Sequence, residues 1–169
     1  MKSLFRPVIM LLVVCSSLVA TAQNFKTPLE LNNYFASIND TLYAGGKEWG
    51  NKLRTVMDSK AFDSLTPIRT KLQQYITVKQ LQLKTMKDVG GSEKFRLAML
   101  DFLNYEEKMM KEAFTPLEKL NKNSTDAEIK TAIDGLINLA GNEEAELKKV
   151  HLAQNEYADK NMFKIEDGN

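Results

Sequence analysis

The sequence has few of the residues from which most catalytic and cofactor sites are built. Among its 169 residues are one cysteine, Cys15, and one histidine, His151. It has no glycine-rich phosphate loop and no Cys-x-x-Cys-His motif for covalent haem. Nucleophilic catalysis, thiolate chemistry and nucleotide binding therefore lack their usual parts. We expect a protein that is not an enzyme and has no metal or cofactor. A carboxylate-based enzyme using Glu106 and Glu143 is the catalytic alternative.

The lone histidine also bears on two metal sites that helical proteins often contain. A di-iron site needs Glu-x-x-His on two helices, whereas the residue three before His151 is Lys148. Non-covalent haem held by His151 with Met86 or Met99 stays open as an alternative, because we predict these residues at similar heights. Methionine on a core stripe is more often a packing residue.

Long apolar runs are scarce, and the one that stands out lies at the N-terminus. Lys2 and Arg6 precede the apolar residues 8–14, and the small residues Ala-Thr-Ala at 20–22 follow. This is the layout of a secretory signal peptide, and we predict cleavage after Ala22. A membrane anchor is the alternative, but the run is shorter than the ~20 residues that cross a bilayer. Lipid attachment at Cys15 is a second alternative, disfavoured by the valine before it.

The predicted mature chain, residues 23–169, has the length of one domain. Loss of Lys2 and Arg6 reduces the 23 basic residues to 21, against 22 acidic residues, so the net charge becomes −1. Such a chain has no electrostatic reason to bind nucleic acid or an anionic membrane. Without Cys15 it can form no disulfide, so packing alone must stabilise it.

Apolar residues recur at steps of three and four along four segments: 31–56, 68–86, 95–120 and 129–157. This spacing is typical of amphipathic helices. No segment of the mature chain alternates as a strand does. Because the connections are short, neighbouring helices should run antiparallel. The predicted fold is all-α, an antiparallel up-down-up-down four-helix bundle.

Local signals mark where these helices begin and end. Capping boxes are predicted at 27–30 and 125–128, where threonine precedes glutamate by three residues. Gly90-Gly91 should close the second helix, and Ser92 should cap the third. The second helix carries Pro67 in its first turn, although its spacing would allow a start as early as Ser59.

Two positions should disturb regular helix. Thr115-Pro116 lies inside the third apolar pattern and predicts a kink. Gly45-Gly46 lies inside the first, with Gly50 one turn further, and each glycine costs roughly 1 kcal/mol in a helix. A break into two helices, a close approach of another backbone, and space for Trp49 or a ligand all remain open. The unbroken apolar stripe favours one helix.

Aligning the helices about their turns predicts a central level at which charged residues interrupt three apolar stripes. Apart from glycines, this level comprises Trp49, Tyr75, Lys79, Tyr105, Glu106, Glu143 and Glu144. A buried carboxylate is costly unless it is paired. The charges could reach solvent at the stripe edges, or satisfy one another as a structural network. Alternatively, they form a pocket with aromatic walls and Glu106 as its acid.

Two segments resemble a known group of proteins. The run RLAMLDF at 96–102 with Tyr105 and Glu106, and the ending AQNEYADKNMFK at 153–164, are similar to exported helical-bundle proteins of Bacteroidetes and spirochaetes. Some of these are catalogued only as surface proteins of unknown function. The resemblance implies export and a helical bundle, and it transfers no activity and no site residue.

These features predict an exported, non-enzymatic helical bundle that serves as a binding or structural module. Its location would be the periplasm or the cell surface. The alternative is a carrier of a small ligand or cofactor, with a pocket at mid-bundle around Trp49, Tyr75 and Glu106. The partner is a protein or a small molecule rather than nucleic acid, and no stable membrane insertion is expected after signal cleavage.

Overall fold

A computed structural model of the chain describes residues 25–165. The predicted signal peptide, its cleavage after Ala22 and the alternative lipid site at Cys15 lie outside the described residues. Within residues 25–165 every regular element is helical and no strand is present, which confirms the all-α prediction. None of these helices combines the length and the apolar character that crossing a membrane requires.

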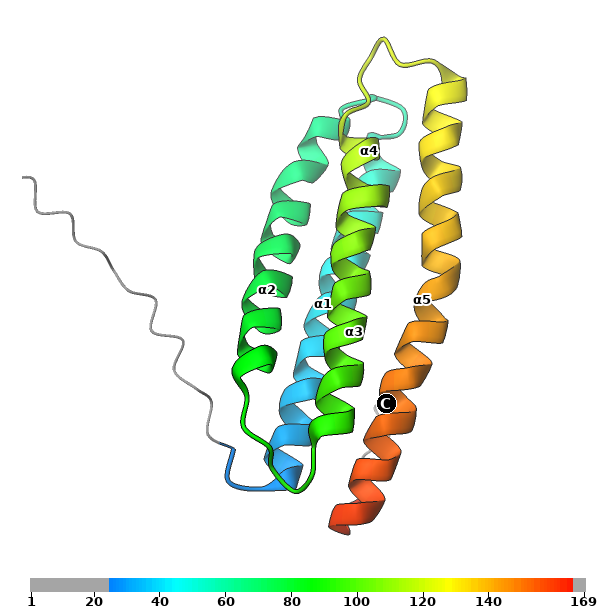
Figure 1. Cartoon of the computed structure of the whole chain (residues 1–169). Helices are drawn as coiled ribbons and strands as arrows, with labels where there is room; N and C mark the ends of the chain where they lie inside the picture. Colours follow the sequence, from blue (N-terminus) through cyan, green and yellow to red (C-terminus); the bar gives the residue numbers. More distant parts are fainter. Residues whose placement is uncertain (1–24, 166–169) are drawn as a thin grey trace, which may run out of the picture.

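The helical elements form four long segments (Figure 1). In chain order they are α1 (Pro28–Val56), a short 3-10 turn η1 (Phe62–Leu65), α2 (Thr66–Thr85), α3 (Glu93–Met109), a π-helical turn η2 (Met110–Phe114), α4 (Thr115–Glu118) and α5 (Asp126–Asn161). The elements α3, η2 and α4 follow one another without a gap and make up the third segment. The four segments match the four predicted apolar patterns.

Helix α1 is one unbroken helix that passes through Gly45-Gly46, as the apolar stripe favours. Thr27 caps it by accepting the backbone N–H of Glu30 at 3.2 Å. The capping box is incomplete there, because the Glu30 carboxylate accepts from the Lys26 N–H instead. Gly45 has a packing reason: a Cβ at this position would lie 2.3 Å from the Leu72 side chain of α2.

The connection between α1 and α2 is more ordered than a simple loop. Phe62 and Leu65 form the η1 turn and are fully buried, so the apolar spacing before Pro67 reflects packing rather than an early start of α2. The prediction that Gly90-Gly91 close the second helix is wrong, because α2 stops at Thr85 with Met86 at its C-cap. Gly90 and Gly91 adopt positive φ values in the loop that follows. Ser92 occupies the N-cap position of α3, but its side chain bonds to the preceding loop and does not cap the helix.

The predicted irregularity at Thr115-Pro116 takes the form of the π-helical turn η2, which ends one residue before Thr115. Proline has no N–H, and its ring clashes with the carbonyl four residues earlier. The wider π turn accommodates the proline. In this turn Thr115 donates hydrogen bonds from its backbone N–H and its hydroxyl to the Met110 carbonyl. Met110 and Phe114, which lie within this turn, are buried.

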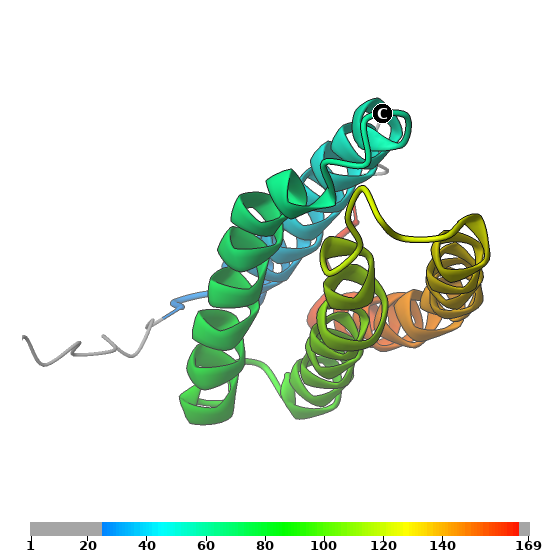
Figure 2. The same cartoon turned by 90° about the horizontal axis from the view of Figure 1, so that it is seen from above.

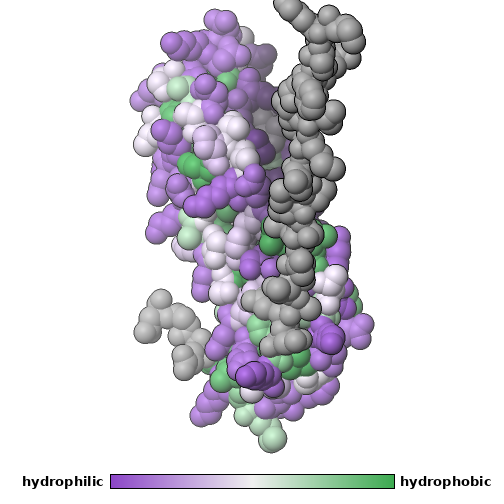
Figure 3. Space-filling view, turned by 90° about the vertical axis from the view of Figure 1, so that its left-hand side faces the viewer, coloured by the Kyte–Doolittle hydropathy of each residue, from purple (hydrophilic) through white to green (hydrophobic). Residues whose placement is uncertain are grey.

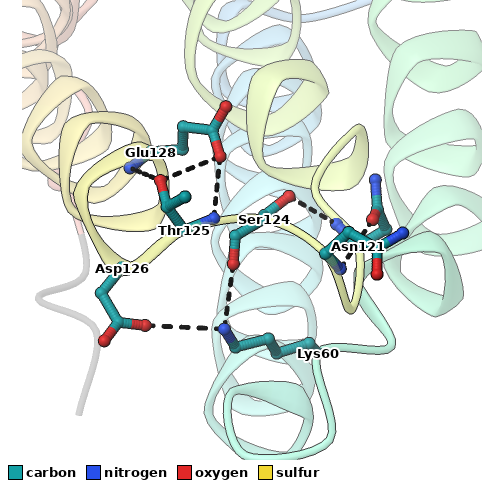
Figure 4. A network of polar contacts seen from close by, with 7 residues as sticks. Lys60, Asn121, Ser124, Thr125, Asp126 and Glu128 are labelled. Atoms are coloured by element: carbon teal, nitrogen blue, oxygen red, sulfur yellow. Dashed lines mark hydrogen bonds and ion pairs between the residues drawn. The ribbon is translucent and has the colours of Figure 1, made fainter.

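Helix α5 begins with the predicted capping box, in which the Thr125 and Glu128 side chains each bond the other's backbone (Figure 4). Lys60 from the α1–η1 loop reaches this end of α5. Its ammonium donates to the Ser124 carbonyl at 3.0 Å and lies 3.5 Å from the Asp126 carboxylate. These contacts tie the start of α5 to the end of α1.

Segment α3 lies between α2 and α5, and its contacts with α5 are the most extensive between any two elements (Figure 2). Contacts between α1 and α5 are sparse by comparison. The core is aliphatic and aromatic, with Phe35, Phe95, Phe102 and Trp49 among its largest fully buried side chains. The loose α1–α5 boundary is where the candidate site lies.

Candidate functional site

A cavity of about 540 Å³ lies between α1, the α3–η2 segment and α5. This volume is within the usual range for small-molecule sites. Tyr43 of α1 and Ile137 of α5 stand at its edges and are 71% and 63% exposed, so the cavity opens to solvent as a groove. We call it the α1–α5 groove. It is lined by Leu42, Tyr43, Gly46, Lys47, Trp49, Gly50, Leu53, Leu72, Glu106, Met109, Met110, Phe114, Leu136, Ile137, Ala140 and Glu143.

Small residues keep the α1–α5 groove wide. Gly46 and Gly50 are one helical turn apart on α1, and nothing lies within 4 Å of a Cβ built at either position. Ala140 lines the α5 side. Unlike Gly45, these two glycines are not required by a neighbour. Their absent side chains leave space in the groove, as one of the sequence-based alternatives proposed.

The inner wall of the groove is aromatic and sulfur-rich. Trp49 is 1% exposed and stacks on Phe114 of the π turn, with ring centroids 3.7 Å apart and planes 10° from parallel. Met109 and Met110 lie beside this pair in the same lining. The indole Nε1 of Trp49 is buried and has no hydrogen-bond partner among the described residues. A buried donor without a partner is costly and calls for an explanation.

Glu106 is the second polar group of the inner wall that lacks a partner. Its side chain is 6% exposed, and its Oε1 accepts no hydrogen bond within residues 25–165. Burial, followed by the nearby charge of Glu143, raises the pKa of Glu106 to about 8. Burial also raises the pKa of Glu143 itself. At neutral pH Glu106 is therefore mostly a protonated carboxylic acid inside an apolar wall.

The other charged side chain in the lining is Lys47, which is exposed at the solvent side. Neither Glu106 nor Glu143 forms an ion pair in the described part of the chain. Chemically, the inner wall offers an apolar surface, one donor on Trp49 and the carboxyl group of Glu106, which can donate or accept. No cluster of three histidine, cysteine or acidic side chains suited to a metal occurs among residues 25–165.

The structure brings Trp49, Glu106 and Glu143 of the predicted central level together in the groove, but it places Tyr75 and Lys79 elsewhere. The Lys79 ammonium lies 4.8 Å from the ring centroid of Tyr34 and 5.1 Å from that of Tyr75. It also donates to the Tyr34 hydroxyl at 3.2 Å. Lys79 is thus held by two aromatic rings on the α1–α2 side, where burial lowers its pKa.

The last two residues of the predicted level also lie outside the groove lining. Tyr105 donates its hydroxyl to the Leu139 carbonyl of α5. Burial raises the pKa of Tyr105, with smaller contributions from Glu143 and Glu106, which places it near the groove carboxyls. Glu144 is exposed. Tyr105 therefore supports the packing of α3 on α5, and Glu144 has no part in the site.

Sequence reasoning missed Met110 and Phe114, which the π turn brings to the groove, and Ile137 at its edge. Thr115-Pro116 was the one signal for the first two, since a proline inside a helical pattern disturbs the turn before it. Of the three candidate haem ligands, His151 and Met99 line a second cavity of about 370 Å³, whereas Met86 does not line it.

The remaining large exposed apolar side chains come from several parts of the fold, with Val78 and Leu81 one turn apart on α2: Leu29, Val78, Leu81, Leu97, Leu152 and Met162. On the face shown in Figure 3, where grey atoms do not cover it, hydrophilic residues predominate and the apolar areas are small and separate. Isolated surface apolar residues are normal and need no partner. Comparison of the chain with family models, with curated proteins and with solved structures finds no match.

Proposed function

We propose that this protein binds a small, mainly apolar molecule in the α1–α5 groove. The observation that carries the proposal is the pair of buried, unpartnered polar groups, Trp49 Nε1 and Glu106 Oε1, in one mainly apolar lining. An apolar cavity with a few convergent polar groups is the usual form of a ligand site. A ligand with an apolar body and a polar head would supply the missing hydrogen bonds.

The scaffold we propose for this site is an up-down-up-down bundle. Short connections and the contacts of α1 with α2, α2 with α3, and α3 with α5 support that arrangement. Bundles commonly build ligand sites from side chains on facing helices. In this arrangement Gly46 and Gly50 leave space at the sparsely contacted boundary between α1 and α5.

We further propose that the carrier acts outside the cytoplasm, as an exported protein of the periplasm or cell surface. The charged start, apolar run and Ala-Thr-Ala of residues 1–22 support this location. The intact mass of the protein from its own host tests it. Loss of residues 1–22 would agree with export. A lipid mass on Cys15 would mean that the protein is anchored to a membrane surface rather than released. An intact N-terminus would contradict both.

Filling the groove tests the binding function. Because nothing lies within 4 Å of a Cβ at position 46, Gly46→Leu should fold and place its side chain in the groove. Gly141→Leu is the matched control: the same change in a helical glycine that is equally uncrowded and does not line the groove. Fluorescence of Trp49, the only tryptophan of the chain, reports binding of decanol as an apolar probe.

We expect decanol to change the Trp49 emission of the wild type and of Gly141→Leu, and to leave that of Gly46→Leu unchanged. Native mass spectrometry of protein from its own host should show a retained non-covalent mass that Gly46→Leu loses. If decanol does not bind the wild type and no mass is retained, the groove is not a ligand site. Equal binding by both leucine variants would place the ligand outside the groove.

A further inference from the structure

The α1–α5 groove contains two carboxyl groups and no cation that neutralises them. Glu106 of α3 is buried in its inner wall, and Glu143 of α5 lines the opposite side. Across the described residues the salt bridges involve neither of them. Like charges that share a site disfavour each other's ionisation. A ligand with a positive charge between the two carboxylates would therefore stabilise their ionised forms.

The groups that face this pair from the surrounding elements do not supply that charge. From α1 come Trp49, Tyr43 and Lys47, and the lysine is exposed and contacts neither carboxylate. Helix α2 contributes Leu72, and the π turn contributes Met110 and Phe114, none of which titrates. Tyr105 lies nearby with its hydroxyl given to a backbone carbonyl.

A metal ion does not fit the same place. Calcium and magnesium need about six oxygen ligands or several retained waters, and among residues 25–165 no third histidine, cysteine or acidic side chain joins the two glutamates. Apart from the exposed Lys47, the rest of the lining is apolar or aromatic, which suits an organic cation with a large apolar body.

We propose that the natural ligand is an organic ammonium compound: an apolar body in the α1–α5 groove, with one protonated amine between Glu106 and Glu143. This inference rests on the proposed function, since it names the polar head of the ligand proposed there. The amine donates to the free Oε1 of Glu106, and its single positive charge offsets the repulsion between the two carboxylates. Charge-assisted hydrogen bonds of this kind are roughly twice as strong as neutral ones.

Without the amine, Glu106 carries a proton instead. Burial and the charge of Glu143 raise the pKa of Glu106 to about 8, so the free protein holds that proton at neutral pH. Binding of an ammonium group then requires Glu106 to release it. At pH 7 only about one molecule in ten has Glu106 ionised, which weakens the apparent affinity about tenfold relative to pH 9. An alkylamine, with a pKa near that of lysine (~10.4), stays mostly protonated at pH 9.

Three probes with the same decyl chain separate the head group from the apolar body: decylammonium, decanol and decanoate. Titrations followed by Trp49 fluorescence at pH 7 and pH 9 give their affinities for the full chain. At pH 9 decylammonium should bind at least about tenfold more tightly than decanol, and decanoate most weakly. From pH 9 to pH 7 the affinity for decylammonium should fall about tenfold, while that for decanol stays constant.

The Glu106→Gln variant should lose the preference for decylammonium over decanol and the pH dependence, yet keep its affinity for decanol. Glu143→Gln should reduce the preference in part, and the exposed Glu144→Gln should behave as wild type. Equal binding of decanol and decylammonium by the wild type would overturn the amine inference and leave the apolar ligand site standing. Binding of none of the three probes would overturn the proposed function. The wild-type series decides the question even if Glu106→Gln does not fold.

Discussion

Removing the carboxyl of Glu106 should change the pH dependence of stability in a defined direction. The pKa of Glu106 is about 8 in the folded protein, because the side chain is buried and faces Glu143. In the unfolded chain it takes the ordinary glutamate value of ~4.3. The folded state therefore holds a proton that the unfolded state has released between these two pH values. By linkage, stability falls as the pH rises through this range.

The magnitude follows from the separation of the two pKa values. The stability associated with protonated Glu106 is fully present below pH ~4.3 and is lost as the pH rises through about 8. At ~1.36 kcal/mol for each pKa unit, the separation corresponds to a total loss of about 5 kcal/mol. This value is an upper limit, because water that enters the groove would solvate the ionised carboxylate and reduce the loss. Of this, up to about 4 kcal/mol falls between pH 5 and pH 9.

Urea denaturation followed by far-UV circular dichroism at pH 5, 7 and 9 measures the effect. Glu106→Gln should be close to wild type at pH 5 and more stable than wild type at pH 9, by up to about 4 kcal/mol. The exposed Glu144→Gln is the control and should follow the wild-type curve. If Glu106→Gln and wild type lose stability in parallel between pH 5 and 9, Glu106 is not protonated in the folded groove and the reasoning fails.

Four further substitutions test single positions in the fold. Gly45→Ala should lower the free energy of unfolding, because its Cβ would lie 2.3 Å from the Leu72 side chain. Gly46→Ala, which meets no neighbour, should raise the free energy of unfolding by up to ~1 kcal/mol. Urea midpoints of the two variants that shift in the same direction would contradict this. Lys60→Met should lose the contacts to the start of α5, so amide hydrogen exchange in the first turn of α5 should become faster. Unchanged exchange in that turn would contradict this. Tyr157→Phe should cost about 1 kcal/mol, because the hydroxyl donates to the Val89 carbonyl at 2.8 Å, and a thermal midpoint equal to wild type would count against it.

The helical segments could be predicted from the sequence because local rules and tertiary packing favour the same structure in these segments. Four apolar stripes with a helical period coincide with the four segments, and the predicted box at Thr125 and Glu128 is present at the start of α5. Agreement across levels of this kind is what makes a fold predictable. The Thr27 box was wrong in one detail, since Glu30 bonds the Lys26 N–H, a choice that depends on the chain before the helix.

The site could be predicted only in part, because loop lengths set the height of a residue but not its direction. Tyr75 and Lys79 were assigned to the central level, yet they lie on the α1–α2 side with Tyr34. One residue along a helix turns the side chain by about 100°, so a small error in rotation moves it to another face. Glu106 and Trp49 were found because they occupy positions on strong apolar stripes, whose direction toward the core is fixed.

The π turn shows a second limit of reasoning from periodicity. A stripe with the α-helical period includes Met109 and Ala113, but it does not predict that Met110 and Phe114 are buried with them. The extra residue in η2 changes the phase of the helix and widens its buried face at this point. The proline predicts a disturbance of the helix but not its form. In the structure the chain forms a π turn, and Phe114 in that turn stacks on Trp49.

Several features that cost stability coincide in the lining of the α1–α5 groove. Gly46 and Gly50 each weaken α1 by roughly 1 kcal/mol without a neighbour that requires them. Glu106 and Trp49 bury polar atoms without partners. Gly45, outside this lining, has a packing reason in Leu72. Natural proteins break local rules mainly where function demands it, and binding sites commonly trade stability for function. Groove substitutions that raise stability should therefore weaken ligand binding, whereas core substitutions should weaken both together, and this opposition of sign distinguishes a binding site from a packing defect.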